Sequence, residues 1–315
     1  MQLKILVAGA GRLGSRYLQG LASANISLDI WVFDVSPESL SVAERRFNEV
    51  NAIVKHTTSY TTKMSELPKR LDFAIVATNA DVRVDLIEAL VTRSAVRFWI
   101  LEKWLAQSVA DLSRLSSLLK VEKAWVNTPR HQWKIYRRLC SSYPDRPPVD
   151  VRVDNLPGLI CNAIHFVDFV CRWSHARLIA VDTSGLRTDW YESKRLGFYE
   201  SNGQLKMIFS DGSHLSLSTE HDNLPFSISL KIGEQEWMID ESNGLAVSAD
   251  GKKIDGSAEL QSELTAPTIR AILSGASCGL PSLAESVQQH RVMLDALTSH
   301  WNAHMPSGVG CLPIT

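Results

Sequence analysis

Three glycines near the start of the chain have a spacing that suits a phosphate-bearing ligand. The apolar run Lys4–Ala8 ends in Gly-x-Gly-x-x-Gly at Gly9, Gly11 and Gly14, and a helical pattern of apolar residues begins there at once. In such a turn the first glycine permits the bend, the second lets the backbone approach a pyrophosphate, and the third lets helix and strand pack closely. Backbone N–H groups and the helix dipole then favour an anion at the helix start. The pattern predicts a dinucleotide site.

An acidic residue at the end of the next strand strengthens this prediction. Asp34 follows the apolar run Leu28–Phe33, about where a carboxylate accepts hydrogen bonds from a ribose in dinucleotide-binding folds. Val35, Ser36 and Pro37 come next, so no Arg or Lys follows closely to accept a 2′-phosphate. The sequence therefore favours NAD over NADP. The alternative is a plain structural role, in which Asp34 caps the following helix.

Further reactive groups lie farther along the chain. Lys103 follows the apolar strand Val96–Leu101. The strongly apolar segment Leu159–Trp173 contains four polar or reactive residues at helical spacing on one stripe, namely Cys161, His165, Asp168 and Arg172. Polar groups on a buried helix must meet partners, water or a ligand, because leaving one unsatisfied costs about 1–3 kcal/mol. A structural His165–Asp168 pair and a catalytic site are both open at this point.

Two other patterns are weaker. His300 and His304 have the i, i+4 spacing of a zinc pair, but no third ligand is evident, so we predict no metal site. Lys134, Arg137 and Arg138 alternate with aromatic and aliphatic residues in a basic amphipathic segment. This segment is either a solvated helix face or a clamp on an anionic substrate such as a nucleotide-linked sugar.

Composition excludes several classes of protein. A chain of 315 residues has room for two domains. Its formal net charge of −1 and charged fraction of 21% argue against binding to nucleic acid or to a membrane surface. Five cysteines without a CxxC pair suit reduced thiols better than a disulfide framework. With neither a signal-peptide pattern nor a membrane-spanning run, we expect a cytoplasmic enzyme.

The first third of the chain alternates between strand and helix. Expected strands are 4–8, 28–33, 71–77, 96–101 and 124–126, with helices near 13–22, 37–50, 82–91 and 108–119. This alternation predicts an α/β fold with a doubly wound parallel sheet, whose ligands lie beyond the carboxyl ends of the strands. Gly9, Asp34, Thr78 and Lys103 all fall at such ends.

The second half of the chain has a different pattern of apolar residues. We therefore predict two domains, residues 1–127 and residues 128–315. Alternating patterns predict strands at 149–153, 177–181, 197–199, 204–209, 214–218, 226–232 and 236–239, with a helix at 159–173 and a closing helix at 283–300. Turn signals at 201–203 and 210–212 should join neighbouring strands as hairpins. The result is an α+β domain with a mostly antiparallel open sheet. Its bare face should pair with another copy in a homodimer or homotetramer.

The order of motifs resembles that of the Gfo/Idh/MocA family, which includes glucose–fructose oxidoreductase, inositol dehydrogenase and the rhizopine-catabolism proteins. The glycine turn is followed by Ala77-Thr78-Asn79, Glu102-Lys103-Trp104, Thr128-Pro129-Arg130-His131 and then Cys161–Asp168. The likeness covers the first domain and reaches about Trp173. The later sheet matches in style only.

This resemblance implies an NAD-dependent oxidoreductase acting on a secondary hydroxyl of a sugar, cyclitol or sugar-nucleotide. Lys103 and His165 should flank the nicotinamide, with His165 taking the hydroxyl proton and Lys103 stabilising the alkoxide. Asp168 should fix the tautomer of His165 or hold a substrate hydroxyl. The expected cofactor-binding residues are Gly9, Gly11, Arg12, Leu13, Gly14, Asp34, Thr78, Asn79, Glu102 and Lys103.

Three positions depart from the family pattern. Cys161 stands where a catalytic Asp is usual, Trp104 replaces a proline, and Arg83 replaces a His. These changes leave open an altered substrate pocket, or a catalytically silent NAD-binding regulatory protein. An amino-acid or imine reductase with the same cofactor domain is a further alternative.

Overall fold

The computed structural model describes residues 2–219, 225–305 and 308–315, apart from the side chain of Glu122. The chain forms two compact units, each assembled from separate segments. The first consists of the residues up to Leu105 together with Ser113–Asn127 and Glu259–Leu283. The second consists of Ala106–Leu112, Thr128–Ala258 and Ala284–Thr315. The sequence-based boundary after Asn127 falls between two of these segments, and Glu259–Leu283 returns to the first unit.

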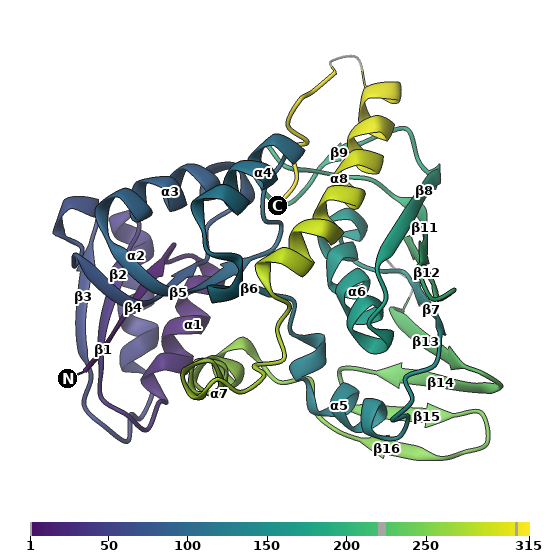
Figure 1. Cartoon of the computed structure of the whole chain (residues 1–315), viewed down its shortest axis with the longest axis horizontal. Coiled ribbons are helices and arrows are strands. Elements are labelled where there is room, and N and C mark those ends of the chain that lie inside the picture. Colours follow the sequence, from purple (N-terminus) through teal and green to yellow (C-terminus); the bar gives the residue numbers. More distant parts are fainter. Residues whose placement is uncertain (1, 220–224, 306–307) are drawn as a thin grey trace. The chain divides into compact units, whose positions relative to one another are not determined.

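The first unit contains a parallel sheet (Figure 1). Its six strands lie in the order β3-β2-β1-β4-β5-β6, and every neighbouring pair is parallel, as in dinucleotide-binding Rossmann folds. This confirms the predicted fold class. The elements of this part of the chain are β1 (Leu3–Ala8), α1 (Arg12–Ala22), β2 (Leu28–Phe33), α2 (Pro37–Asn48), β3 (Thr57–Thr61), β4 (Arg70–Val76), α3 (Ala80–Arg93), β5 (Ala95–Glu102), α4 (Val109–Leu118) and β6 (Ala124–Asn127).

The central strands form where the chain is continuously apolar. The side chains of Ile5–Ala8 in β1 and Phe73–Val76 in β4 are fully buried. Such burial is typical of parallel strands covered on both faces. Sequence periodicity does not reveal β3, because Thr57–Thr61 is polar and half-buried, as suits a strand at the sheet edge.

The returning segment adds helix α7 (Gln261–Ser274), which packs on α1. A Cβ on Gly20 of α1 would lie 2.6 Å from the carbonyl oxygen of Ser262 and from Cβ of Thr265, so only glycine permits this close approach. Ile269 of α7 joins the apolar core of the first unit. The sequence does not predict α7, since Pro267 interrupts its helical pattern.

The second unit contains an eight-stranded sheet in the order β16-β15-β14-β13-β7-β12-β11-β8 (Figure 1). All neighbouring pairs are antiparallel except β7 and β12, so the prediction of a mostly antiparallel sheet is confirmed. Helix α6 packs against β12. The elements are α5 (Lys134–Ser141), β7 (Val149–Asp154), α6 (Leu159–Ser174), β8 (Leu178–Leu186), β9 (Tyr191–Glu192), β10 (Tyr199–Glu200), β11 (Gly203–Phe209), β12 (His214–Thr219), β13 (Ser227–Ile232), β14 (Gln235–Asp240), β15 (Leu245–Ser248), β16 (Lys253–Asp255) and α8 (Leu283–His304).

Of the two predicted hairpins, the one at 210–212 is present, and the prediction of one at 201–203 is wrong. The turn at 210–212 joins β11 to β12, as expected. The turn at 201–203 does not join β10 to β11, because β10 pairs with β9 in a separate two-stranded sheet. Gly203 has a φ of +107°, and a Cβ there would lie 2.3 Å from the carbonyl oxygen of Gly185 in β8. The Asn-Gly signal therefore marks a close approach to β8.

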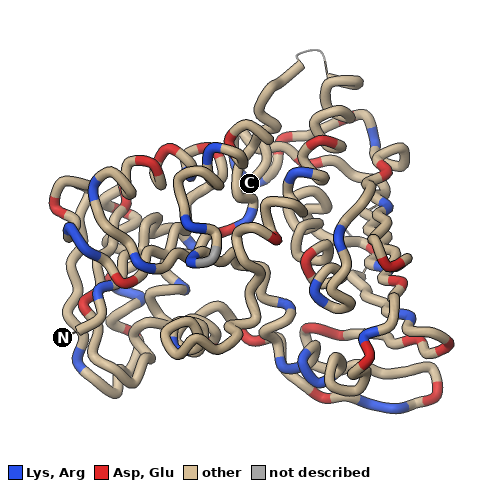
Figure 2. Tube along the Cα trace, viewed as in Figure 1, with Lys and Arg blue, Asp and Glu red and all other residues tan. Residues whose placement is uncertain are grey.

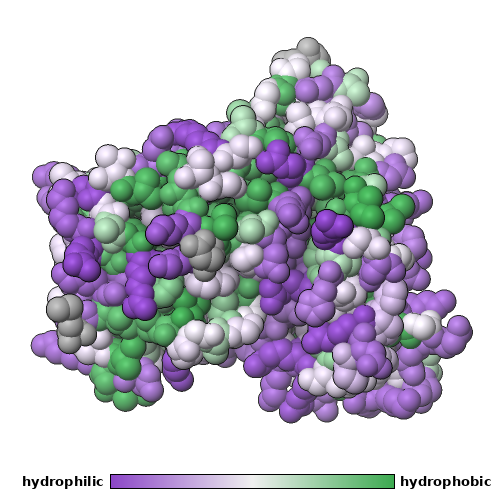
Figure 3. All heavy atoms as spheres, in the orientation of Figure 1, coloured by the Kyte–Doolittle hydropathy of each residue, from purple (hydrophilic) through white to green (hydrophobic). Residues whose placement is uncertain are grey.

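Charges of both signs alternate along both units (Figure 2). Hydrophilic residues dominate the surface over α5 and β14–β16, whereas apolar residues reach the surface around α8 and β8 (Figure 3). None of the helices that the structure describes is both long and apolar enough to cross a membrane.

Candidate functional site

The glycine turn between β1 and α1 is held by close backbone contacts. Gly9 has a φ of +96°, and its N–H donates to the carbonyl of Phe33 at 2.8 Å. A Cβ on Gly14 would lie 1.8 Å from the carbonyl oxygen of Gly9, so helix and turn meet only because both residues are glycine. A Cβ on Gly11 would meet nothing within 4 Å. The three glycines thus have two different roles: Gly9 and Gly14 allow close packing within the turn, whereas Gly11 borders open space.

That open space lies at the N-terminus of α1. Gly11 is the N-cap residue and provides no side chain to the first turn, and Arg12 next to it is exposed. The first turn contains no acidic residue. The N–H groups of a helix start favour an anion, and a backbone without a Cβ allows one to approach. These residues fit the pyrophosphate of a dinucleotide.

Asp34 is fixed beside the same turn. Its Oδ2 accepts the N–H of Ala10 at 2.6 Å, and its Oδ1 accepts the N–H of Ser36 at 2.9 Å. Helix α2 is capped by Ser36, whose hydroxyl accepts the N–H of Ser39. Asp34 therefore does not act as the helix cap. Each carboxylate oxygen keeps a lone pair that can accept a ribose hydroxyl.

Other expected cofactor-binding residues follow β4 and β5, whose carboxyl ends lie at the same edge of the sheet as those of β1 and β2. Thr78 and Lys103 are half-buried and Asn79 is exposed at the N-cap of α3. Glu102 is 4% exposed, and its Oε1 accepts hydrogen bonds from the hydroxyl of Tyr17 at 2.5 Å and from Nδ2 of Asn127 at 2.6 Å. Burial raises the pKa of this carboxyl. Glu102 thus anchors the strand end from which Lys103 follows.

Two of the departures from the family pattern are linked in space. The Arg83 guanidinium is buried and donates to the backbone carbonyls of Trp104 and Thr78. It therefore ties together the loops that follow β4 and β5. Trp104 is fully buried, and the peptide bond between Lys103 and Trp104 is cis. Arg83 and Trp104 together shape the turn that holds Lys103.

The start of α6 is bound by groups from far along the chain. The Glu200 carboxylate accepts the N–H of Ile160 at 2.8 Å and that of Cys161 at 3.0 Å. A carboxylate is favoured there by the helix dipole. The Cys161 thiol donates to the backbone carbonyl of Thr315 at 2.8 Å. The position of the usual catalytic Asp is thus occupied by a thiol that contacts backbone.

One turn beyond the half-buried His165, Asp168 forms a buried polar cluster. Its Oδ2 accepts from the hydroxyl of Thr128 at 2.7 Å, and its Oδ1 accepts from Nε2 of Gln289 at 3.1 Å. Burial raises the pKa of the Asp168 carboxyl to about 6. Asp168 thus pairs with Thr128 and Gln289. It joins α6 to α8 and to the segment that follows β6.

Sequence reasoning missed a second buried cluster in the same unit. Nε of Arg130 donates to Glu241 at 2.9 Å, and the guanidinium lies 3.8 Å from the ring centroid of Phe166 on α6. The Tyr136 hydroxyl also donates to Glu241 at 2.6 Å. The Arg130 position is visible in the family pattern. Its partner lies more than 100 residues away, and no local signal marks it.

The histidine pair near the C-terminus and the basic segment of α5 both contact other parts of the second unit. Nε1 of Trp190 donates to Nδ1 of His300 at 3.2 Å, and the His300 ring stacks on that of His304. Among the described residues, no group of three or more His, Cys, Asp and Glu side chains is placed to hold a metal ion. In the basic segment, Arg138 donates to the backbone carbonyl of Asp255. None of the five cysteines, all of which the structure describes, forms a disulfide.

Solved structures that share the fold include proteins named as dehydrogenases and oxidoreductases. UDP-N-acetylglucosamine 3-dehydrogenase from Acidithiobacillus ferrooxidans superposes with a TM-score of 0.68 at 14% identity, over 94% of this chain and 96% of that one. The chain has the fold of the Gfo/Idh/MocA-type oxidoreductases. An oxidoreductase from Agrobacterium radiobacter in complex with NAD+, L-tartaric acid and magnesium gives 0.69 at 14% identity, over 96% and 97% of the two chains.

The myo-inositol 2-dehydrogenase from Lactobacillus plantarum gives a TM-score of 0.68 at 12% identity, over 96% of this chain and 98% of that one. No protein-family model and no curated protein sequence matches the chain. The structural likeness therefore rests on the fold rather than on shared sequence.

Proposed function

We propose that the protein is an NAD-dependent oxidoreductase that acts on a secondary hydroxyl of a sugar, cyclitol or sugar-nucleotide. The observation that carries this proposal is the edge of the first sheet, where a glycine turn open at Gly11 lies beside the carboxylate of Asp34. The neighbours support the substrate class, since they include a nucleotide-sugar dehydrogenase and an inositol dehydrogenase. NAD rather than NADP is proposed because Asp34 would repel a 2′-phosphate.

The proposed mechanism assigns separate tasks to Lys103 and His165. The residues around Gly11 and Asp34 would hold NAD, whose nicotinamide would supply a hydride acceptor for the substrate carbon. The neutral imidazole of His165 would take the hydroxyl proton, and the ammonium of Lys103 would stabilise negative charge on the substrate oxygen. Asp168 holds Thr128 and Gln289, so we assign it a positioning role on the helix that carries His165. Lys103 lies in the first unit and His165 in the second.

A specific observation favours a second candidate function. Cys161 stands where a catalytic carboxylate is usual in the family, and its thiol donates to backbone. A thiol cannot replace a carboxylate as an acceptor for a substrate hydroxyl or for His165. The second candidate is therefore a protein that binds NAD without turnover and acts through a partner.

The decisive experiment measures NADH formation at 340 nm with a panel of polyols, cyclitols and nucleotide sugars. The oxidoreductase proposal expects turnover with at least one of them and a preference for NAD over NADP. NAD binding by calorimetry without turnover on any substrate would favour the silent protein instead. Failure to bind either dinucleotide would refute both.

We also propose that the protein is cytoplasmic and forms a homodimer or homotetramer through the second sheet. A groove of about 420 Å³ lies across β7, β8, β11 and β12 of that sheet, lined in part by the exposed Ile208. Met238 on β14 is also half exposed. Apolar groups of this kind on one sheet face are typical of an interface. A monomeric mass by light scattering at micromolar concentration would refute this assembly.

A further inference from the structure

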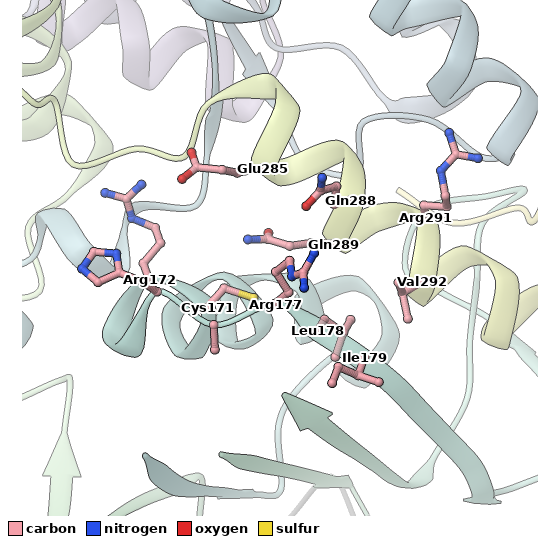
Figure 4. Close-up of a pocket in the computed structure, with 12 residues that line it drawn as sticks. Cys171, Arg172, Arg177, Leu178, Ile179, Glu285, Gln288, Gln289, Arg291 and Val292 are labelled. Carbon is pink, nitrogen blue, oxygen red and sulfur yellow. The ribbon is translucent and has the colours of Figure 1, made fainter. Parts of the chain in front are cut away.

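The second unit contains a cavity that the proposed reaction does not use. Its volume is about 540 Å³, within the range of small-molecule sites. It lies between the end of α6, the start of β8 and the first turns of α8 (Figure 4). Neither Lys103 nor His165 lines it.

The charged side chains that line the cavity are mainly basic. Arg172, Arg177 and Arg291 contribute three guanidinium groups, against the single carboxylate of Glu285. Arg172 on α6 and Arg177 just before β8 extend toward α8, while the Arg291 side chain on α8 points away from both (Figure 4). The Nε atom of Arg172 is buried and has no hydrogen-bond partner within the described part of the chain. The C-terminus of α6 itself disfavours an anion, so the arginines must supply the attraction.

A second, independent observation concerns Gln289. This side chain is 4% exposed and lines the cavity, and its Nε2 donates to the carboxylate of Asp168. Because a carboxylate accepts hydrogen bonds, this contact fixes the orientation of the amide. The amide oxygen is then buried without a partner among the described residues. A buried acceptor of this kind calls for a donor, and a ligand in the cavity can bring one.

We propose that this cavity binds a small organic oxyanion that also carries hydroxyl groups, namely a phosphate ester or a carboxylate of a sugar or polyol. The arginines match the paired oxygens of the anion, and a hydroxyl donates to the Gln289 oxygen. Such a ligand forms a hydrogen bond with Gln289, whose amide also donates to Asp168 on α6. It therefore contacts a partner of the C-terminal half of α6, whereas Cys161 lies near the N-terminus of that helix. The proposal does not depend on dehydrogenase activity, because it rests on binding alone.

Calorimetry of the whole protein at low salt tests the site with three probes: glucose 6-phosphate, gluconate and inorganic phosphate. We expect at least one of the two hydroxylated probes to bind with a Kd of about 1 mM or tighter. The stronger of the two identifies the anion as a phosphate ester or a carboxylate. Arg172→Gln and Arg177→Gln should each weaken its binding about 10- to 100-fold, as for loss of a charged hydrogen bond. Arg187→Gln, an exposed arginine elsewhere in the unit, should leave binding unchanged.

A further variant tests the amide. Native protein should bind the stronger of the two hydroxylated probes more tightly than inorganic phosphate, and Gln289→Met should remove that difference. Thermal unfolding of each variant checks folding, and Arg177→Gln is the safer of the two arginine changes because Arg177 is exposed. Failure of both hydroxylated probes to bind with a Kd of about 1 mM or tighter, or equal weakening in Arg187→Gln, would overturn the proposal.

Discussion

The glycine turn of the first unit and the polar stripe of α6 in the second carry the two halves of the proposed chemistry, and they are built differently. In the turn, backbone groups of neighbouring residues make the site. The absence of a Cβ at Gly14 allows close packing on Gly9, and its absence at Gly11 leaves open space beside the backbone. On α6, Asp168 and Cys161 are each held by a residue distant in sequence, namely Gln289 and Thr315. A site made from backbone tolerates sequence divergence around its glycines. A site made from distant side chains can lose one member, as at Cys161, and be rebuilt.

The largest expected effect concerns the two proposed catalytic residues, His165 and Lys103. His165→Ala should lower kcat about 10²- to 10⁴-fold on whichever substrate the panel identifies, because it removes the proton acceptor. Lys103→Met should be at least as damaging, since it removes the charge that stabilises the alkoxide. NAD affinity, measured alongside, should change little. Full activity in both variants would place the chemistry elsewhere.

Cys161→Asp serves as the internal comparison for these two variants. If the missing carboxylate has weakened the site, this change should raise kcat. If the pocket has been rebuilt around the thiol and Thr315, it should be neutral or harmful.

The next largest effect concerns the turn. Gly14→Ala should destabilise the protein by about 3 kcal/mol, because its Cβ would overlap the Gly9 carbonyl. Gly11→Ala is the matched control, since its Cβ meets no atom of the chain. It should leave the unfolding free energy unchanged and still weaken NAD binding. Equal stability of the two variants by urea unfolding would contradict the account of the turn.

Two buried groups of the second unit should give opposite pH dependences. Burial lowers the pKa of His131 to about 4, so between pH 6.5 and 4 the unfolded chain binds a proton that the folded chain does not. Its contribution to the unfolding free energy therefore falls with decreasing pH, by about 2–3 kcal/mol. The pKa of Asp168 is raised from 3.8 to about 6, so its contribution is largest at low pH and is lost as pH rises through that interval.

His131→Gln should therefore make the protein relatively more stable at pH 4 than at pH 6.5, compared with the native chain. Asp168→Asn should shift the balance the other way. The test is the unfolding free energy from urea titrations at several pH values. Parallel curves for the native protein and both variants would show that neither group titrates as described.

The smallest expected effect is on cofactor binding. Asp34→Ala should weaken NAD binding roughly 10- to 100-fold, because a charged hydrogen bond is lost. NADP binding should weaken less or improve, since the repulsion of its 2′-phosphate is relieved. Equal native affinity for both dinucleotides would argue against Asp34 as the discriminating residue.

Much of the first unit was predictable because its signals are local. The run 28–33 and the glycine spacing located β2 and the turn, since continuous burial and backbone geometry leave a direct mark on residue type. Edge strand β3 and helix α7 were not predictable, because their residues are polar or broken by Pro267 and depend on packing for stability. Tertiary contacts decide such segments.

Less of the second site could be predicted. The helix and its polar stripe were evident from the period of the sequence, but the partners of Asp168 and Cys161 were not. Gln289 and Thr315 lie more than 100 residues from α6, and nothing in their neighbourhood marks them as partners. The Asn-Gly turn at 202–203 misled for a related reason, because its backbone conformation serves contact with β8.

The return of Glu259–Leu283 to the first unit affects the protein while it is being made. The face of α1 that α7 covers stays bare after the ribosome has passed Asn127, until the segment ending at Leu283 emerges. At roughly 5–20 residues per second this interval is on the order of ten seconds. During it the nascent chain presents an incomplete Rossmann unit while the second unit is still being synthesised. The face of α1 around Gly20, which makes room for α7, therefore stays open to other contacts during this interval.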